Sequence, residues 1–304
     1  MASHVISFTF VPEKLVELLT VELPYSLPLL RRLQSTKFEH GTSPHARTIF
    51  VSDTDFAIIE QAQKPMTYSA AYLDFSRQET QMYIYSTLEN SRNRDDTSNR
   101  ELYEQQLAEL VQEVIRLRKE YGPELLFTNP DRILIGALHS ETRSILEKFQ
   151  GRVEPRPTGI YDKWLIMRDQ LPFLDESLPP GMYWDSADLD DCRTIVSRTD
   201  IPQDNQYCGS EMLLNLQNLV IKRQDKTPIA WALLGNDGSL MSVHCEEPYR
   251  RRGLAKKLAI KLIWEKSSQF GGDGYISADV SPTNLSSQAL CKSLNSKPDW
   301  IVSC

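Results

Sequence analysis

The segment that most constrains this chain is residues 239–258, where an apolar run, a short basic turn and an amphipathic run follow one another. Residues 240–245 are mostly apolar and follow the turn signal Asp237-Gly238, which predicts a buried strand. Pro248 ends the extended run. Apolar residues then recur at helical spacing, with lysines between them, at Leu254, Leu258, Ile260, Leu262 and Ile263. The segment therefore predicts a strand, a tight turn and a helix in direct succession.

The turn has the chemistry of an anion site. It consists of Arg250-Arg251-Arg252-Gly253-Leu254-Ala255, at the start of the predicted helix. A helix N-terminus has unpaired backbone N–H groups and a partial positive charge, and small residues let an anion approach that backbone closely. Arginines add forked donors that suit phosphate. The turn predicts a pyrophosphate cradle; the alternative is a solvated basic turn before a surface helix.

Composition narrows the class of protein. The 304 residues suggest two domains or one large one, and the balance of 40% hydrophobic and 25% charged residues is that of a folded soluble chain. A net charge of −7 argues against nucleic acid and against an anionic membrane surface as partners. No apolar run is long enough to span a membrane. The five cysteines form no C-x-x-C pair, so neither a disulfide framework nor a metal site is predicted, and a reducing compartment fits best.

The first half predicts a meander of strands with helices at both ends. Two short helices fall in residues 13–33, a long helix in 101–121, a strand in 133–138 and a helix in 140–149; the meander strands are residues 48–51, 56–59, 66–73 and 82–85. No basic glycine turn precedes the long helix, and Asp95-Asp96 there would repel phosphate. The proline-rich stretch 150–178 predicts a crossing strand at 161–167 and marks a domain boundary. We therefore expect domains at 1–160 and 161–304.

The second half predicts a sheet built around the central segment. Helices are expected at residues 188–197 and 286–294, and strands within 213–223 and at 228–234, 240–245, 275–280 and 298–303.

Residues 218–294 resemble the core of the GNAT acyltransferase superfamily in three places. The basic turn is similar to the family's coenzyme A loop, Gln/Arg-x-x-Gly-x-Gly/Ala. Trp231 lies in a strand followed by an Asp-Gly turn, and Asn284-x-x-Ser287-x-x-Leu290 is similar to the family's N-x-x-S-x-x-L-Y segment. The run Leu-Pro-Tyr-Ser-Leu-Pro at 23–28 further resembles the glycine N-acyltransferase-like branch, in which a degenerate N-terminal half precedes the GNAT half.

The resemblance implies an α+β, or mixed α/β, fold of tandem GNAT-like domains, each with a twisted, mostly antiparallel sheet flanked by helices. A generic mixed domain used for packing is the alternative for the first half. The implied co-substrate is acetyl-CoA or a longer acyl-CoA, with no metal. Backbone groups of Val243 and Cys245 would pair with it, and N–H groups of residues 251–255 would hold its pyrophosphate. The full implied set is Val243, His244, Cys245, Arg250, Arg251, Arg252, Gly253, Leu254, Ala255, Lys256 and Asn284. For Asn284, a helix N-cap is an equal alternative.

The catalytic positions depart from the family pattern. Ser239 stands where many members have a glutamate as general base, and Cys291 stands where many have a tyrosine as general acid. A neutral hydroxyl is a poor base at pH 7, and a buried structural cysteine is the commoner case. His244 is a third candidate, as a base, although strand alternation with Val243 and Cys245 can also turn it away from the acceptor. We retain His244, Ser239 and Cys291 as candidate catalytic residues.

The sequence thus predicts an acyl-CoA-dependent N-acyltransferase that moves an acyl group to a small amine or amino acid by direct attack in a ternary complex. The alternatives are a non-catalytic module that binds coenzyme A or a protein partner, and O-acylation of a hydroxyl, which needs a stronger base. We expect a monomer or homodimer in the cytoplasm, with the nucleus as an alternative, and no nucleic-acid or membrane partner.

Overall fold

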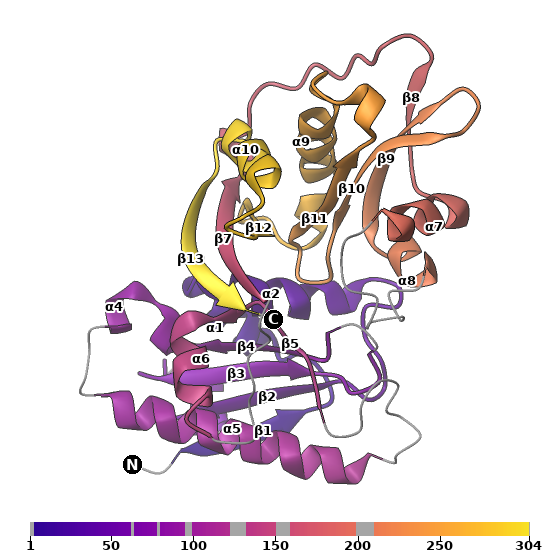
Figure 1. The fold of residues 1–304 in the computed structure, drawn as a ribbon. Coiled ribbons are helices and arrows are strands. Elements are labelled where there is room, and N and C mark those ends of the chain that lie inside the picture. The colour runs from indigo at the N-terminus through magenta and orange to yellow at the C-terminus, as the bar shows by residue number, and fades with distance from the viewer. Residues whose placement is uncertain are drawn as a thin grey trace. The chain divides into compact units, whose positions relative to one another are not determined.

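The computed structural model describes residues 3–61, 64–77, 80–94, 99–121, 132–149, 159–198 and 210–303. The chain forms two compact units. Unit 1 comprises Met1–Ile160 together with Ile301–Cys304, and unit 2 comprises Tyr161–Trp300. In both units a mostly antiparallel sheet is flanked by helices, which is the mixed α+β class that the sequence predicts (Figure 1).

Unit 1 is built on a sheet with strand order β1-β2-β3-β4-β5. Its pairs are antiparallel except for β4 and β5, which are parallel. The elements are β1 (His4–Phe8), α1 (Glu13–Val21), α2 (Leu27–Gln34), η1 (Ser35–Lys37), β2 (Arg47–Ser52), α3 (Phe56–Glu60), β3 (Tyr68–Leu73), β4 (Met82–Ser86), η2 (Thr87–Glu89), α4 (Ser91–Arg94), α5 (Arg100–Glu120), β5 (Ile135–Gly136), β6 (Leu138–His139) and α6 (Ser140–Leu146).

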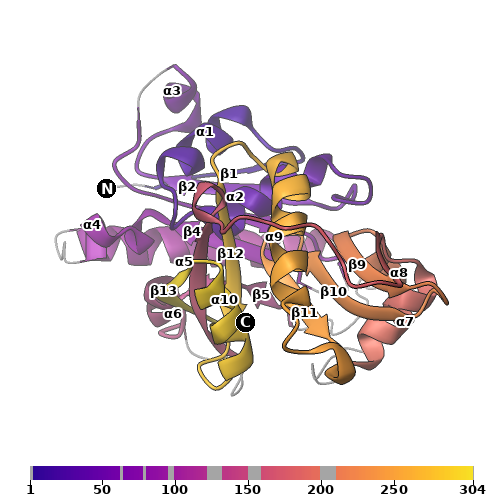
Figure 2. The same ribbon diagram turned by 90° about the horizontal axis from the view of Figure 1, so that it is seen from above.

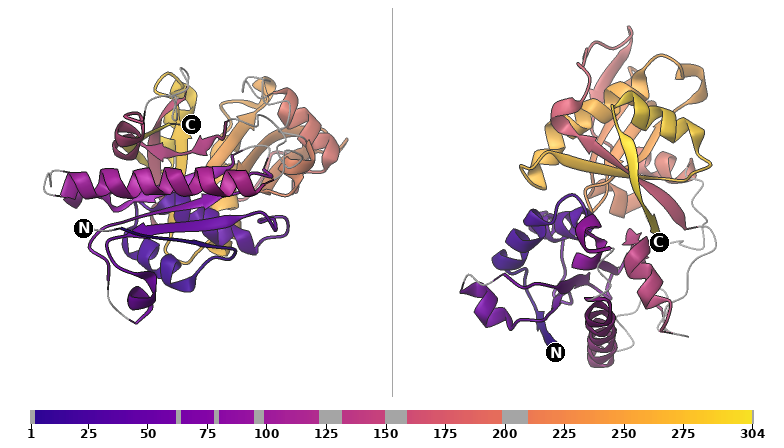
Figure 3. Two further views of the ribbon diagram at one scale, coloured as in Figure 1. Left: turned by 90° about the horizontal axis from the view of Figure 1, so that it is seen from below. Right: turned by 90° about the vertical axis from the view of Figure 1, so that its left-hand side faces the viewer.

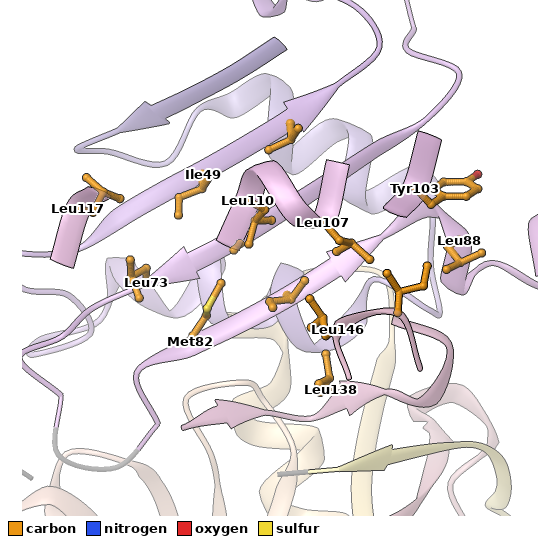
Figure 4. Packing of buried hydrophobic residues seen from close by; sticks show 14 of the residues in the cluster. Ile49, Leu73, Met82, Leu88, Tyr103, Leu107, Leu110, Leu117, Leu138 and Leu146 are labelled. Carbon is orange, nitrogen blue, oxygen red and sulfur yellow. The ribbon is translucent and has the colours of Figure 1, made fainter. Parts of the chain in front are cut away.

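Helices cover both faces of the unit 1 sheet. Successive strand residues point to opposite faces, so Phe50 packs with the leucines of α1 and α2 while Ile49 packs with those of α5. Figure 3 shows α5 lying along the sheet, and Figure 4 shows its leucines Leu107, Leu110 and Leu117 facing the apolar side chains of the strands. Each fully buried leucine contributes about 2 kcal/mol through the apolar area it removes from water.

The structure corrects the sequence prediction at three places in unit 1. Residues 56–59 form the helix α3 rather than a strand, because the Asp55 carboxylate caps it by accepting from the Ala57 N–H at 2.8 Å. The predicted strand 133–138 is two short strands separated at Ala137, whose φ is 49°. Strand β1 was not predicted. Asp95 and Asp96 lie outside the described residues.

Unit 2 contains two groups of strands. One sheet has the order β11-β10-β9-β8, and β12 pairs antiparallel with β7 in the order β12-β7-β13. The elements are β7 (Ile160–Met167), η5 (Arg168–Gln170), β8 (Met182–Asp185), α7 (Leu189–Ser197), α8 (Ser210–Leu214), β9 (Gln217–Arg223), β10 (Pro228–Leu234), β11 (Leu240–Cys245), η6 (Glu247–Tyr249), α9 (Leu254–Lys266), η7 (Ser267–Gln269), β12 (Tyr275–Val280), α10 (Leu285–Ser293) and β13 (Lys297–Ser303). The predicted strand-turn-helix order of the central segment is confirmed.

The two faces of the β8–β11 sheet have different covers. Trp231 and Leu233 of β10 pack in one apolar cluster with Cys192 and Ile195 of α7 and with Leu213 of α8. The helix α9 packs against β9, β10 and β11, and Figure 2 shows it across the strands from α7 and α8. The sheet therefore has one face toward α9 and one toward α7 and α8; helix α8 was not predicted from the sequence.

One buried lysine organises the start of α7. Lys222 of β9 is 2% exposed, and its Nζ lies 2.6 Å from Asp191 Oδ2, 3.1 Å from Asp188 Oδ2 and 3.3 Å from Asp185 Oδ2. Asp188 and Asp191 also form a capping box, in which each carboxylate accepts the backbone N–H of the other. Burial alone would lower the pKa of Lys222, but hydrogen bonds to the three aspartates raise it. The ammonium thus balances three carboxylates at this helix N-terminus.

We expect Lys222→Met to destabilise unit 2, because three carboxylates then face one another without a cation. Breaking a buried ion pair on one side costs about 3 kcal/mol, and urea unfolding followed by tryptophan fluorescence measures the loss. The matched control is Lys297→Met, which removes the same charge from an exposed site. Equal midpoints for the two variants would contradict the structural role of Lys222.

Candidate functional site

Strand β11 contains a β-bulge in the middle of the unit 2 sheet. His244 pairs with Trp231 and Met241 with Leu233, so the single residue Ala232 of β10 faces two residues of β11. Ser242, at the bulge, has a φ of 51°. An extra residue bends a strand and shifts its alternation by one position. Met241 and His244, three positions apart, therefore point to the same face, the face covered by α7 and α8.

The other edge of β11 separates from β12. Within the described ranges, the one bridge between the two segments is the parallel pair Ser239 and Ser277, just before β11 begins. Beyond that bridge the two strands belong to different sheets. An edge strand presents backbone N–H and C=O groups that a ligand can pair with as an added strand.

The orientation of the peptide groups on β11 follows from two hydrogen bonds. Glu246 N–H donates to Ile229 C=O at 2.9 Å, toward β10. Peptide groups of adjacent strand residues point to opposite edges, so those of Cys245 point toward the open side. The side chain of Arg250 agrees with this direction, because its Nε donates to Cys245 C=O at 2.9 Å. The Cys245 carbonyl is thus used by the loop, and its N–H faces the open edge.

The basic loop ends at a glycine that opens the helix. Gly253 is the N-cap of α9, with a φ of 76°, and no side chain caps the helix there. A Cβ at Gly253 would meet nothing within 4 Å, so the space next to it is open. The left-handed backbone favours glycine at this position. The first-turn N–H groups of α9 have no helical acceptors, and no side chain caps them, so an anion could bind them.

The three arginines of the loop have different surroundings. Arg250 braces the loop against β11, and Arg252 donates to Pro248 C=O at 3.2 Å with its guanidinium 5.7 Å from the Tyr249 ring. Arg251 is exposed and has a φ of 62°. An exposed guanidinium beside uncapped helical N–H groups fits a phosphate anion. The residues present therefore fit the pyrophosphate of a coenzyme A molecule.

His244 has a defined environment on the α7 face. Its ring stacks on Trp231 with a centroid distance of 4.4 Å and an interplanar angle of 15°. Nε2 lies 3.7 Å from Glu246 Oε2, and Glu246 Oε1 accepts from Arg198 Nε at 2.9 Å. Burial lowers the pKa of His244, partly opposed by the charge of Glu246. The imidazole is therefore neutral at pH 7 and can accept a proton.

The other two candidate catalytic side chains have partners or are buried. Ser239 Oγ donates to Asp237 Oδ1 at 2.6 Å, and Ser239 is 9% exposed. Cys291 is 2% exposed, and burial raises the pKa of its thiol to about 11. A thiol of high pKa that is shielded from solvent is a poor proton donor. Of the three candidates, the environment favours proton transfer at His244.

Asn284 is the N-cap of α10. Its Oδ1 accepts from the Ser287 N–H at 3.0 Å, and the residue is exposed. The oxygen is thus used as a cap, the alternative that the sequence left open, while the side-chain amide N–H groups remain available to a ligand.

Cys245 is half-buried, and burial raises the pKa of its thiol.

Some groups near β11 were not singled out from the sequence. Arg198 at the end of α7 pairs with Glu246, and Lys163 of β7 pairs with Asp279 of β12. These contacts join residues 48 and 116 positions apart along the chain, so no local spacing could have found them.

Within the described ranges, no group of three or more His, Cys, Asp or Glu residues is arranged to hold a metal ion, and no helix has the length and apolar character needed to cross a membrane.

Comparisons with known families cover nearly the whole chain. A model described as the acyl-CoA N-acyltransferase verG N-terminal domain matches residues 4–164. A model described as the acetyltransferase (GNAT) family matches residues 165–295. No curated protein sequence matches the chain significantly.

Three solved structures align with nearly the whole chain. An X-ray structure of a Drosophila protein has a TM-score of 0.62 and 16% identity, covering 96% of this chain and 93% of the other. A tandem GNAT protein from the clavulanic acid biosynthesis pathway has a TM-score of 0.48 and 11% identity, covering 99% and 97%. A GCN5-related N-acetyltransferase from Sphaerobacter thermophilus has a TM-score of 0.48 and 14% identity, covering 98% and 94%. At 16% identity, the likeness to the Drosophila protein shows the fold alone.

The verG-type model covers more than half of the residues, and the GNAT model covers the segment that contains β11, the basic loop and α9. The chain therefore belongs to the acyl-CoA N-acyltransferase family, as a tandem protein in which a verG-type N-terminal domain precedes a GNAT acetyltransferase domain.

Proposed function

We propose that this acyltransferase moves an acyl group from acetyl-CoA or a longer acyl-CoA to a small amine or amino acid, by direct attack within a ternary complex. The observation that carries the proposal is the open edge of β11, which is followed, after η6 and the basic loop, by the uncapped N-terminus of α9. The pantetheine arm would pair with peptide groups of Val243 and Cys245. The pyrophosphate would lie on N–H groups of residues 251–255, with Lys256 and Asn284 at the border of the site.

The bound thioester supplies an activated acyl carbon, and the protein positions it. A backbone N–H at the bulge that points to the thioester oxygen would stabilise the negative charge of the tetrahedral intermediate. Holding the amine beside the carbonyl converts a bimolecular encounter into an intramolecular one, which lowers the barrier through pre-organisation. Arg251 and the α9 N-terminus contribute by binding a part of the coenzyme that does not react.

The proton balance assigns a role to His244. An acceptor that arrives as an ammonium ion loses two protons in becoming an amide nitrogen, and the departing thiolate gains one. We propose that neutral His244 takes the proton released from nitrogen after attack and returns it to the leaving sulfur as the C–S bond breaks. The Glu246 carboxylate lies 3.7 Å from Nε2 and would stabilise the positive charge of the imidazolium while it carries the proton. As the sequence predicts, we further propose that the acceptor is a small amine or amino acid. We also propose that the protein acts in the cytoplasm, with the nucleus as the alternative, as a monomer or homodimer.

The loop assignment predicts the effect of placing anions against the pyrophosphate. In the double variant Arg251→Glu/Gly253→Asp, affinity for acetyl-CoA should fall by at least about 100-fold, a loss of roughly 2.7 kcal/mol. Isothermal titration calorimetry measures it. The control is Lys266→Glu, which reverses a charge at the far end of α9. If the double variant keeps wild-type affinity, the loop does not bind the coenzyme.

The assignment of His244 predicts a selective loss of turnover. His244→Gln keeps a planar polar side chain but cannot accept a proton, so kcat should fall about 100-fold, with acetyl-CoA affinity unchanged. Free-thiol release in the presence of an amine panel measures kcat. Cys291→Ala is the comparison, and we expect its kcat to stay near that of the wild type because the buried thiol lies outside the proton path. Wild-type turnover by His244→Gln would exclude the histidine.

The pKa of His244 provides a test that does not depend on activity. Because Glu246 raises this pKa and Arg198 lowers it, Glu246→Gln removes the stabilising anion and should move the titration of His244 to lower pH. NMR of the imidazole carbon signals measures the midpoint. Glu247→Gln, an exposed neighbour in η6, should leave the midpoint unchanged, and equal midpoints in both variants would contradict the electrostatic interaction between Glu246 and His244.

A further inference from the structure

A buried ion pair joins β12, the strand next to the open edge of β11, to its neighbour β7. Lys163 of β7 and Asp279 of β12 are cross-strand partners, and Lys163 Nζ lies 2.6 Å from Asp279 Oδ1. The lysine side chain is fully buried. Neither Nζ nor Oδ1 has a further hydrogen-bond partner within the described part of the chain. Two charged groups so placed require each other, since an unpaired buried charge is strongly disfavoured.

The ion pair shares a face with the catalytic candidates. Side chains of bridged residues point to the same face of a sheet, and so do residues two positions apart on one strand. Ser277 is bridged to Ser239, and Asp279 lies two residues beyond Ser277. By the same alternation, and across the bulge, Ser239 shares its face with Met241 and His244. Asp279 therefore lies on the same face as His244, the proposed proton acceptor.

The carboxyl group of Asp279 is fixed by Lys163 but remains partly exposed to solvent. Oδ1 is buried against the lysine, whereas 21% of the side chain is exposed. The charged groups that act on it are Lys163 from β7 and Asp237 from the turn before β11. Burial raises the pKa of Asp279, with Lys163 opposing and Asp237 reinforcing the effect. Two carboxyl groups thus act beside one ammonium, an arrangement in which a second cation near Asp279 would favour its ionised form.

We infer that Asp279 receives the acceptor amine as its ammonium ion and takes the first of the two protons that the nitrogen must lose. This inference rests on the proposed N-acyl transfer and supplies from β12 the carboxylate that the family pattern would place at Ser239. The step is balanced: ammonium and carboxylate become neutral amine and carboxylic acid. The amine lone pair then forms the C–N bond to the thioester carbon, and Asp279 later releases its proton to solvent. Lys163 acts as a positioning residue by fixing Oδ1.

The test compares a charged and a neutral acceptor of similar shape. At pH 7, 2-phenylethylamine is an ammonium ion, whereas aniline is a neutral amine that needs no initial deprotonation. In Asp279→Asn we expect kcat/KM for 2-phenylethylamine to fall about 100-fold, while the value for aniline stays near wild type and acetyl-CoA affinity is unchanged. The matched control is Asp299→Asn, at an exposed site on β13, which should leave kcat/KM for both amines unchanged.

The pH profile separates proton transfer from a structural role. With Asp279→Asn, the deficit for 2-phenylethylamine should shrink as the pH approaches the pKa of the amine, because free amine is then supplied by solvent. An equal loss for both acceptors at every pH would overturn the role of Asp279 while leaving the proposed function standing. Absence of acetyl-CoA binding, or of turnover of either amine by the wild type, would overturn the proposed function and this inference with it.

A second variant addresses folding. Lys163→Met combined with Asp279→Asn removes both charges, so no unpaired ion is left in the interior. We expect this double variant to fold and to show the same selective loss toward 2-phenylethylamine. A folded double variant with wild-type activity toward both amines would overturn the inference.

Discussion

The site depends on the separation of β11 from β12 after their single bridge. Ser239 and Ser277 hold the strands together at one point, and the bulge at Ser242 bends β11 beyond it. The edge of β11 that faces β12 thus keeps peptide groups without a strand partner, while the opposite edge of β11 pairs with β10. If the coenzyme binds here as proposed, this backbone pairing would not depend on the acyl group, because pantetheine carries amides of its own.

The two ends of β11 have opposite electrostatic surroundings. The uncapped N-terminus of α9 and the exposed Arg251 favour an anion at one end of β11. Asp279 and Asp237 favour a cation near the other end. His244 lies between them with a lowered pKa and a neutral ring. An anionic coenzyme and a cationic amine would therefore be drawn to opposite ends of one strand, with a proton acceptor where they react.

The sequence predicted what depends on local spacing and missed what depends on register. The basic turn and Gly253 could be recognised because the strand, loop and helix are contiguous. The face of His244 could not be derived, since one extra residue in a strand reverses every later side chain and the bulge leaves no clear sequence signal. Asp279 was missed for another reason: its partner Lys163 lies 116 positions earlier and is joined to it by strand pairing. The helix at residues 56–60 shows a capping aspartate outweighing an apolar run that suggested a strand.

Amide hydrogen exchange with and without acetyl-CoA tests the central claim most directly. If the coenzyme pairs with the open edge of β11 and with the start of α9, saturating acetyl-CoA should slow exchange at Val243, Cys245 and residues 251–255, and leave the ladder between β9 and β10 as it was. Slowed exchange elsewhere in the protein, with no change at these amides, would contradict the account. Binding would then use a different surface, and the free edge of β11 would need another explanation.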